Sequence, residues 1–175
     1  MEPSKVHFQE MQRMRAWWMV LLILIPSALV CWGAFQQLLL GEPWGDNPAS
    51  NELMMFLVVV IGIGLPIILL NVKMTVVVSD NIYIKFSPFM LRPRVVTPRE
   101  VLSYRVLQYR PIVDYGGWGI KGTSSDRAYN VHGNQGVNIA LMDDKQITIG
   151  SQRPGDLILA LDALVWANRD RRAGD

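Results

Sequence analysis

Few side chains in this sequence have the types and spacing that catalysis or metal binding requires. Ser125, Asp126 and His132 fall within eight residues and supply the three side-chain types of a hydrolytic triad. A triad also needs a nucleophile on a strained turn, an oriented base and an oxyanion site, and no GxSxG motif accompanies these residues. The two histidines, His7 and His132, lie far apart without companion cysteines or closely spaced carboxylates. We therefore expect no enzyme activity, no metal site and no cofactor.

Two long apolar runs contain neither charged residues nor histidines, which argues against a proton relay, an ion site or a histidine ligand for haem or chlorophyll within them. The one cysteine, Cys31, lies inside the first run, so we expect no disulfide and no CxxC motif. Channel, transporter and pigment-binding roles are therefore not predicted for this chain by itself.

Basic side chains are the remaining candidates for binding chemistry. From residue 73 to 175 the chain has fourteen Lys or Arg and ten Asp or Glu, a net charge of about +4. This charge suits a domain beside anionic lipid headgroups and is too weak to predict a nucleic-acid partner. A loose basic series could contact lipid headgroups or an acidic partner, or could simply be a solvated sheet edge kept from aggregating by its charges. The series consists of Arg92, Arg94, Arg99, Arg105 and Arg110.

The two apolar runs, residues 17–40 and 53–72, predict a transmembrane helical hairpin. Each is close to or longer than the roughly 20 residues that a helix needs to cross about 30 Å of hydrocarbon. Basic residues precede the first run and follow the second, whereas the loop 41–52 contains acidic residues and no Lys or Arg. This bias predicts that both termini are cytoplasmic. A cleaved signal peptide is the alternative for the first run, but the run exceeds the usual 7 to 15 apolar residues and no A-x-A-like site follows it.

Short-range patterns predict how the hairpin packs and how the chain enters it. Residues 1–16 form a cytoplasmic N-terminal segment with a weak apolar face, which we interpret as a short helix on the membrane surface. The second span is predicted to begin after Asn51 and Glu52, which resemble an N-cap with a first-turn acid. Gly62 and Gly64 form a small-residue patch that lets the first span approach near Gly33.

From Lys73 onward the apolar residues alternate, which is typical of strands. Residues 74–78 and 82–86 alternate on either side of Ser79, Asp80 and Asn81, which predicts a β-hairpin. A helix of about residues 154–168 has Pro154 near its start and an apolar stripe on one face. Further strands are expected at residues 94–96, 104–109, 119–122, 129–131, 137–142 and 146–149. The prediction is an α+β membrane protein in which the hairpin precedes a barrel or sandwich of about seven strands closed by a C-terminal helix.

Several short motifs give this region a family resemblance. They are VTPREV at 96–101, YGGWGIK at 115–121, AYNV at 128–131, GV at 136–137 and IGSQRP at 149–154. In this order they resemble a bacterial pleckstrin-homology-like (PH-like) domain that follows two membrane spans, and the resemblance covers residues 74–167. It departs from the pattern at Lys121, where Arg is expected, and at Asp144, where Gly is common. The resemblance implies an interaction module in a bacterial inner membrane and no catalytic signature.

Three residues or groups of residues in this region have alternative readings. PH domains that hold phosphoinositides gather cations on both sides of the first hairpin turn. Here Lys73 and Lys85 flank the turn but Ser87 stands where another cation is needed, so phosphoinositide recognition is not predicted. Trp118, among three glycines, is interpreted as packed within the domain, with partner contact as the alternative. Arg153 is interpreted as pairing with Asp156 or a carbonyl, with ligand contact as the alternative.

Together these observations predict a non-catalytic accessory or scaffold subunit of a larger membrane complex, of the respiratory or photosynthetic kind. The PH-like domain, residues 73–175, would dock on other membrane-protein subunits, and the spans would pack against the helices of those subunits and against membrane lipids. A homo-oligomeric, membrane-anchored sensor of lipid or peptide is the alternative.

Overall fold

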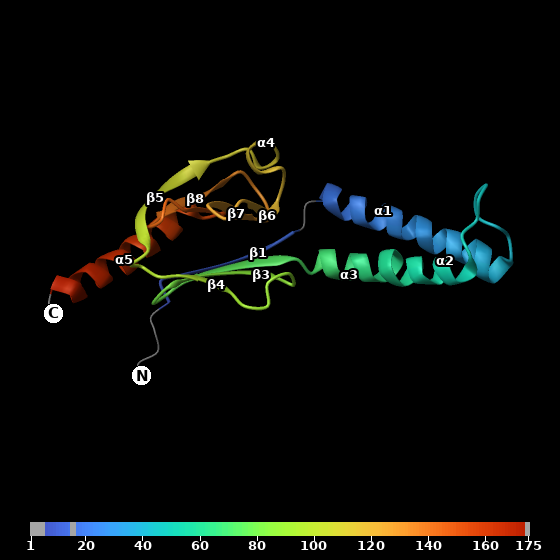
Figure 1. The fold of residues 1–175 in the computed structure, drawn as a ribbon, viewed down its shortest axis with the longest axis horizontal. Coiled ribbons are helices and arrows are strands. Elements are labelled where there is room, and N and C mark those ends of the chain that lie inside the picture. Colours follow the sequence, from blue (N-terminus) through green and yellow to red (C-terminus); the bar gives the residue numbers. More distant parts are fainter. Residues whose placement is uncertain (1–5, 15–16, 174–175) are drawn as a thin grey trace. The chain divides into compact units, whose positions relative to one another are not determined.

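The computed structural model describes residues 6–14 and 17–173, with side chains through Asn168. The chain divides into two compact units. Residues Met14–Val72 form a helical unit, and the residues through Arg13 join those from Lys73 onward in a β-rich unit (Figure 1). The fold is therefore α+β, and the β unit is assembled from both sides of the helical insertion.

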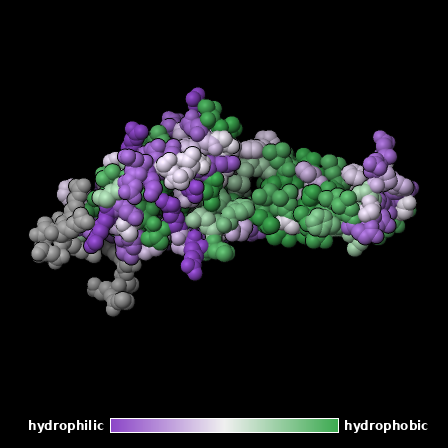
Figure 2. Space-filling view, viewed as in Figure 1, coloured by the Kyte–Doolittle hydropathy of each residue, from purple (hydrophilic) through white to green (hydrophobic). Residues whose placement is uncertain are grey.

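The helical unit contains two helices that are long and apolar enough to cross a membrane. The first runs through α1 (Trp17–Ala34) into a π-helical segment, η1 (Phe35–Leu40), and has a mean hydropathy of 2.2. The second comprises α2 (Asn51–Leu57), η2 (Val58–Gly64) and α3 (Leu65–Leu70), with a mean hydropathy of 3.0. Figure 2 shows the nearly continuous hydrophobic surface of this unit.

The second helix begins slightly earlier than the apolar run suggested. Its cap is Ser50, whose Oγ accepts a hydrogen bond from the backbone N–H of Leu53 at 3.3 Å. The predicted cap, Asn51, was therefore one position too late, whereas Glu52 is the acidic residue of the first turn, as predicted. A serine at this position satisfies one of the donors that a helix start leaves free.

The N-terminal segment forms a strand, β1 (Phe8–Arg13), and the predicted surface helix was wrong for these residues. β1 pairs antiparallel with β2 (Lys73–Val78), so that Phe8 lies opposite Val78 and Arg13 opposite Lys73. The rest of that predicted helix, residues 1–5 and 15–16, lies outside the described residues. The two strands that flank the helical unit in sequence are thus neighbours in one sheet.

The first sheet has the strand order β1-β2-β3-β4. β3 (Ile82–Ser87) pairs with β2 and confirms the hairpin predicted around residues 79–81. The third pair joins β3 to β4 (Arg94–Val96), a strand predicted at these residues. Side chains that alternate along β2 and β3 are fully buried, among them Met74, Ile84 and Phe86.

The second sheet has the order β5-β8-β9-β7-β6, with β7 and β9 parallel and the other neighbours antiparallel. The described residues thus form nine strands in two sheets, whereas about seven strands in one barrel or sandwich were predicted. Neither sheet closes on itself, because each has two edge strands. The strands are β5 (Val101–Gln108), β6 (Gly119–Gly122), β7 (Asp126–Asn130), β8 (Gln135–Leu141) and β9 (Gln146–Gly150), with a short helix α4 (Pro111–Tyr115) after β5.

The C-terminal helix α5 (Pro154–Ala173) contacts strands of both sheets. It starts at the predicted Pro154 and extends five residues beyond the predicted end at 168. Its apolar side chains recur every three or four positions and are buried. These side chains are Leu157, Ala160, Leu161 and Leu164. The core of the β unit therefore depends on this helix as much as on either sheet.

Candidate functional site

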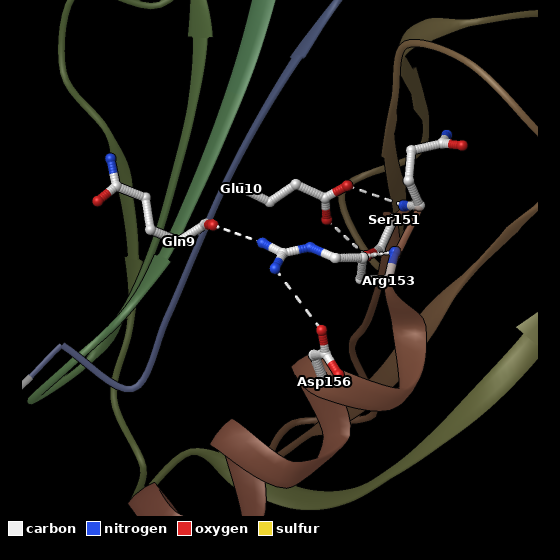
Figure 3. A network of polar contacts seen from close by, with 6 residues as sticks. Gln9, Glu10, Ser151, Arg153 and Asp156 are labelled. Atoms are coloured by element: carbon white, nitrogen blue, oxygen red, sulfur yellow. Dashed lines mark hydrogen bonds and ion pairs between the residues drawn. The ribbon is translucent and has the colours of Figure 1, made fainter.

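The turn after β9 holds strand β1 through a buried carboxylate. Glu10 points its side chain inward from β1 and is only 8% exposed. One of its carboxylate oxygens accepts a hydrogen bond from the Ser151 hydroxyl at 2.6 Å, and the other accepts one from the backbone N–H of Gln152 at 2.9 Å (Figure 3). A carboxylate in this position satisfies two donors that the core would otherwise leave unpaired.

Contacts of two further residues, Gln12 and Arg153, complete this arrangement, which we call the β1 clamp. The Gln12 side-chain amide donates to the carbonyl of Gly150 at 2.8 Å. The Arg153 guanidinium donates to the carbonyl of Gln9 at 2.8 Å and lies 3.6 Å from the carboxylate of Asp156 (Figure 3). Arg153 also lies over the ring of Phe8, 5.1 Å from its centroid. The predicted pairing of Arg153 with Asp156 or a carbonyl is therefore confirmed, and the carbonyl belongs to β1.

Glu10 and Gln12 were missed by sequence reasoning. The buried positions of β1 are Phe8, Glu10 and Gln12, so the core face of this strand is mostly polar and shows no apolar alternation. The only signal was the SQRP motif of the turn, from which Arg153 was predicted to pair with Asp156 or a carbonyl, without any indication that the carbonyl belongs to β1. The hydrogen bonds of the β1 clamp join residues about 140 positions apart, which no local pattern predicts.

The basic series does not form one surface. Arg92 lies in the loop between β3 and β4, and Arg94 begins β4 at the same end of the sheet. Arg99 follows β4 at the opposite end, Arg105 lies midway along β5, and Arg110 precedes α4. Arg92 and Arg94 therefore share one end of the first sheet, whereas Arg110 follows the last residues of β5 in the second sheet.

A cavity of about 340 Å³ opens beside the turn between β2 and β3. Its lining includes Asp80 and Arg99 as well as residues of α5. The Ser79 hydroxyl donates to the Asp80 carboxylate at 2.8 Å and, with a further hydrogen bond from Tyr83, lowers the pKa of that carboxyl group. A carboxylate that stays ionised repels phosphates, and Lys73 lies at the opposite end of β2. This geometry does not resemble a polyphosphate site.

Trp118 is half-buried, and its indole N–H donates to the carbonyl of Gly133 at 3.3 Å. It lies in the segment between α4 and β6. Gly116, Gly117 and Gly119 around it all have positive φ angles, between 70° and 121°, so the backbone there takes a course that other residues would strain. Trp118 therefore covers the surface of the β unit and is less enclosed than the core side chains.

We predict that Trp118→Ala lowers the free energy of unfolding by about 1 to 2 kcal/mol, because a fully buried tryptophan is worth about 3 to 5 kcal/mol and this one is half-buried. Urea denaturation of the full chain in detergent, followed by circular dichroism, measures the loss. Trp118→Phe keeps most of the ring contact and should lose less. A loss as large as that of a core leucine would contradict the partial burial.

The small residues of the helical unit have different neighbours. A Cβ placed on Gly62 would lie 2.9 Å from the sulfur of Cys31, so Gly62 allows the two helices to approach. Nearby, the Ser27 hydroxyl donates to the Ile61 carbonyl across the helices at 2.9 Å. A Cβ on Gly33 would lie 2.5 Å from ring atoms of Trp44, so Gly33 accommodates the loop indole, whereas contact with the second span was expected. The nearest obstacle to a Cβ on Gly64 is the carbonyl of Val59 in its own helix.

The three side chains that resembled a triad lie at different ends of β7. Asp126 begins β7 and Ser125 precedes it, where the serine hydroxyl lies 3.1 Å from that of Thr123. His132 follows the other end of this five-residue strand. At about 3.3 Å per residue, the strand separates the histidine from the other two by well over hydrogen-bond distance. Among the described residues, no three His, Cys, Asp or Glu side chains are grouped so as to hold a metal ion.

Comparison with known proteins gives one family. Residues 2–167 match the model of a family of unknown function, DUF6141. No curated protein and no solved structure matches the chain. The match covers the helical unit and the β unit as far as most of α5. The chain therefore belongs to the DUF6141 family.

Proposed function

We propose that the protein is a membrane-anchored, non-catalytic docking subunit, in which the helical unit crosses the membrane and the β unit binds another membrane-protein subunit. The observation that carries the proposal is the outer edge of β5. None of the eight side chains of this strand is buried, and Leu102 and Val106 are 58% and 53% exposed. An edge strand with exposed apolar side chains is a template for pairing with another chain.

The anchoring part rests on the two apolar helices and on the pairing of β1 with β2. β1 ends four positions before α1, and β2 begins three positions after α3. Because these strands are neighbours in one sheet, a hairpin that crosses the membrane twice leaves both on the same side. The basic flanks and the acidic loop favour the cytoplasmic side.

A groove in the helical unit supports packing with a helix of a partner subunit. It has a volume of about 470 Å³, and apolar side chains of both helices line it. Helices associate in membranes by close packing of such surfaces. The lining residues are Cys31, Ala34, Phe35, Leu38, Leu39, Met55, Val58 and Val59.

We propose that the β unit is PH-like. Two largely antiparallel sheets followed by one C-terminal helix that contacts both support this assignment, as do the motifs between residues 96 and 154. The parallel pair β7 and β9 is a departure from a simple meander of antiparallel strands. PH-like folds serve many binding functions, so the proposed docking role depends on the β5 edge and not on the fold.

We predict that a photo-crosslinking amino acid at Val106 of the full chain, irradiated in native membranes, joins the protein to one membrane-protein subunit. The matched control is the same amino acid at Met11, which is 51% exposed on β1 in the other sheet. Mass spectrometry of the adduct identifies the subunit. The same subunit should no longer copurify with Val106→Glu, because a charge on the apolar edge opposes its burial.

Equal adducts from both positions, or none from Val106, would contradict docking at this edge. An adduct of the chain with itself would favour the homo-oligomeric sensor. Copurification that persists in Val106→Glu would transfer the docking role to the helical unit.

A further inference from the structure

One end of the β unit carries two exposed apolar tips. The first is the loop between β3 and β4, where Phe89 is 58% and Leu91 is 93% exposed. The second is α4, where Ile112 and Val113 are 66% and 67% exposed. Figure 2 shows hydrophobic surface over both elements. Side chains of this size on two separate projections call for a partner that is itself apolar.

The strand register places both tips at the end of the β unit from which the chain leaves for the helical unit. Ser87, which precedes the first tip, lies opposite Lys73, and Lys73 lies opposite Arg13. In the second sheet, Gln108 at the end of β5 lies opposite Gln135, and Gly136 lies opposite Gly150. The Gln12 side chain reaches this Gly150 carbonyl. The ends of β1 and β5 and the start of β2 therefore lie at the same end of the β unit (Figure 1).

The covalent chain limits how far this end can be from the second helix. Lys73 follows Leu70, the last residue of α3, by three positions. Three residues span at most about 11 Å. The headgroup layer on each side of a bilayer is about 5 to 8 Å thick. If α3 ends where the hydrocarbon ends, the start of β2 lies at or just beyond the headgroups.

The charged side chains beside the two tips and at the facing ends of β1 and β2 are mostly basic. Arg92 and Arg94 adjoin the first tip, Arg110 adjoins the second, and Arg13 and Lys73 lie where β1 ends and β2 begins. Among the described residues of the two tips, Asp114 in α4 is acidic. Its carboxylate accepts a hydrogen bond from the backbone N–H of Arg110. Apolar tips bordered by basic side chains match the interface of a bilayer with anionic headgroups.

We infer that this end of the β unit rests on the membrane that its own helices cross, with Leu91 and Val113 at the headgroup layer and with Arg92, Arg94 and Arg110 on anionic lipid. The inference rests on the proposed anchoring and is independent of the β5 edge. With this contact, the β unit is held against the membrane in a fixed orientation and is not merely tethered to it by the chain.

The experiment places an environment-sensitive fluorophore on single cysteines of the full chain in a Cys31→Ala background. The chain is reconstituted in vesicles of phosphatidylcholine and phosphatidylglycerol, and quenching is measured with nitroxides on the headgroup, nitroxides deep in the acyl chain, and iodide in water. Positions 91 and 113 are expected to be quenched by headgroup nitroxides and shielded from iodide. The matched control is Met142, 51% exposed in the turn between β8 and β9 at the opposite end of the unit.

A label at Ile63 in the second helix distinguishes failure of the membrane contact at the tips from failure of the membrane anchoring by the helices. If deep nitroxides quench position 63 while 91 and 113 are as open to iodide as 142, the membrane contact is overturned and the anchoring stands. If position 63 is open to iodide, the anchoring itself fails. Tips that become shielded only when another protein is present would assign this end to a protein partner and would also overturn the inference.

The arginines are tested by charge removal. Arg92→Gln, Arg94→Gln and Arg110→Gln together should reduce headgroup quenching at Leu91 in vesicles that contain phosphatidylglycerol and leave it unchanged in pure phosphatidylcholine. The matched control removes three basic residues from elsewhere in the unit, Arg99, Arg105 and Lys145. Equal effects of the two triple variants would overturn the role of the named arginines.

Discussion

Leu161→Ala should lower the free energy of unfolding of the β unit by about 3 to 5 kcal/mol. Leu161 is fully buried on α5, a helix that contacts strands of both sheets. Its truncation removes apolar contacts and leaves a cavity that neither sheet can close without moving the helix. Hydrogen exchange of the full chain in detergent measures the change, because the most protected amides of the core strands exchange only through unfolding of the unit.

The matched control is Leu159→Ala, the same substitution two positions away on the same helix. Leu159 is 68% exposed, so its truncation should change the stability by less than about 0.5 kcal/mol. Helix propensity changes equally in the two variants, so their difference reports the packing of Leu161 alone. If the two losses were equal, α5 would not be part of the core.

The hairpin and the C-terminal helix could be predicted because their local patterns agree with their tertiary environments. β2 and β3 bury every second side chain, and α5 buries one stripe. Residues 79–81 supply turn chemistry between the two strands. Where the core face is apolar, one period in the sequence fixes both the type of element and the side that it buries.

Strand β1 could not be predicted because its buried side chains are mostly polar and their hydrogen-bond partners are distant in sequence. Glu10 and Gln12 occupy core-facing positions, and their partners lie beyond residue 149. The apolar Met11 lies on the exposed face, opposite to what alternation would suggest. The chain enters the helical unit directly after β1, which made residues 1–16 resemble a membrane-surface segment.

The sequence identified the basic residues of the candidate site but not their arrangement in space. The five arginines were found from composition, but which of them share an end depends on strand register, which a sequence specifies only through long-range packing. β5 shows the same limit. Its first residues form a β-bulge against β8 and none of its side chains is buried, so its beginning at Val101 has no alternating pattern.

Breaking the β1 clamp is the sharpest test of how the two sequence segments of the β unit are joined. Glu10→Ala leaves the Ser151 hydroxyl and the Gln152 N–H without their acceptor, and Ser151 is only 1% exposed. Because hydrogen bonds to a charged group are worth about 1.5 to 3 kcal/mol each and an unpaired buried donor is costly, we expect a loss of about 2 to 4 kcal/mol. Native-state hydrogen exchange of the full chain measures it, and the amides of β1 should lose the most protection.

Two control variants decide whether the carboxylate or the strand itself is responsible. Met11→Ala changes a side chain on the exposed face of the same strand and should cost less than about 1 kcal/mol. Glu10→Gln keeps one acceptor oxygen and should fall between the other two variants. A loss in Glu10→Ala no larger than that in Met11→Ala would show that backbone pairing with β2 alone holds β1. If the losses follow the expected order, the carboxylate of Glu10 holds β1 to the turn before α5. The β unit is then complete only when β1, which precedes the helical unit, has packed against strands that follow it.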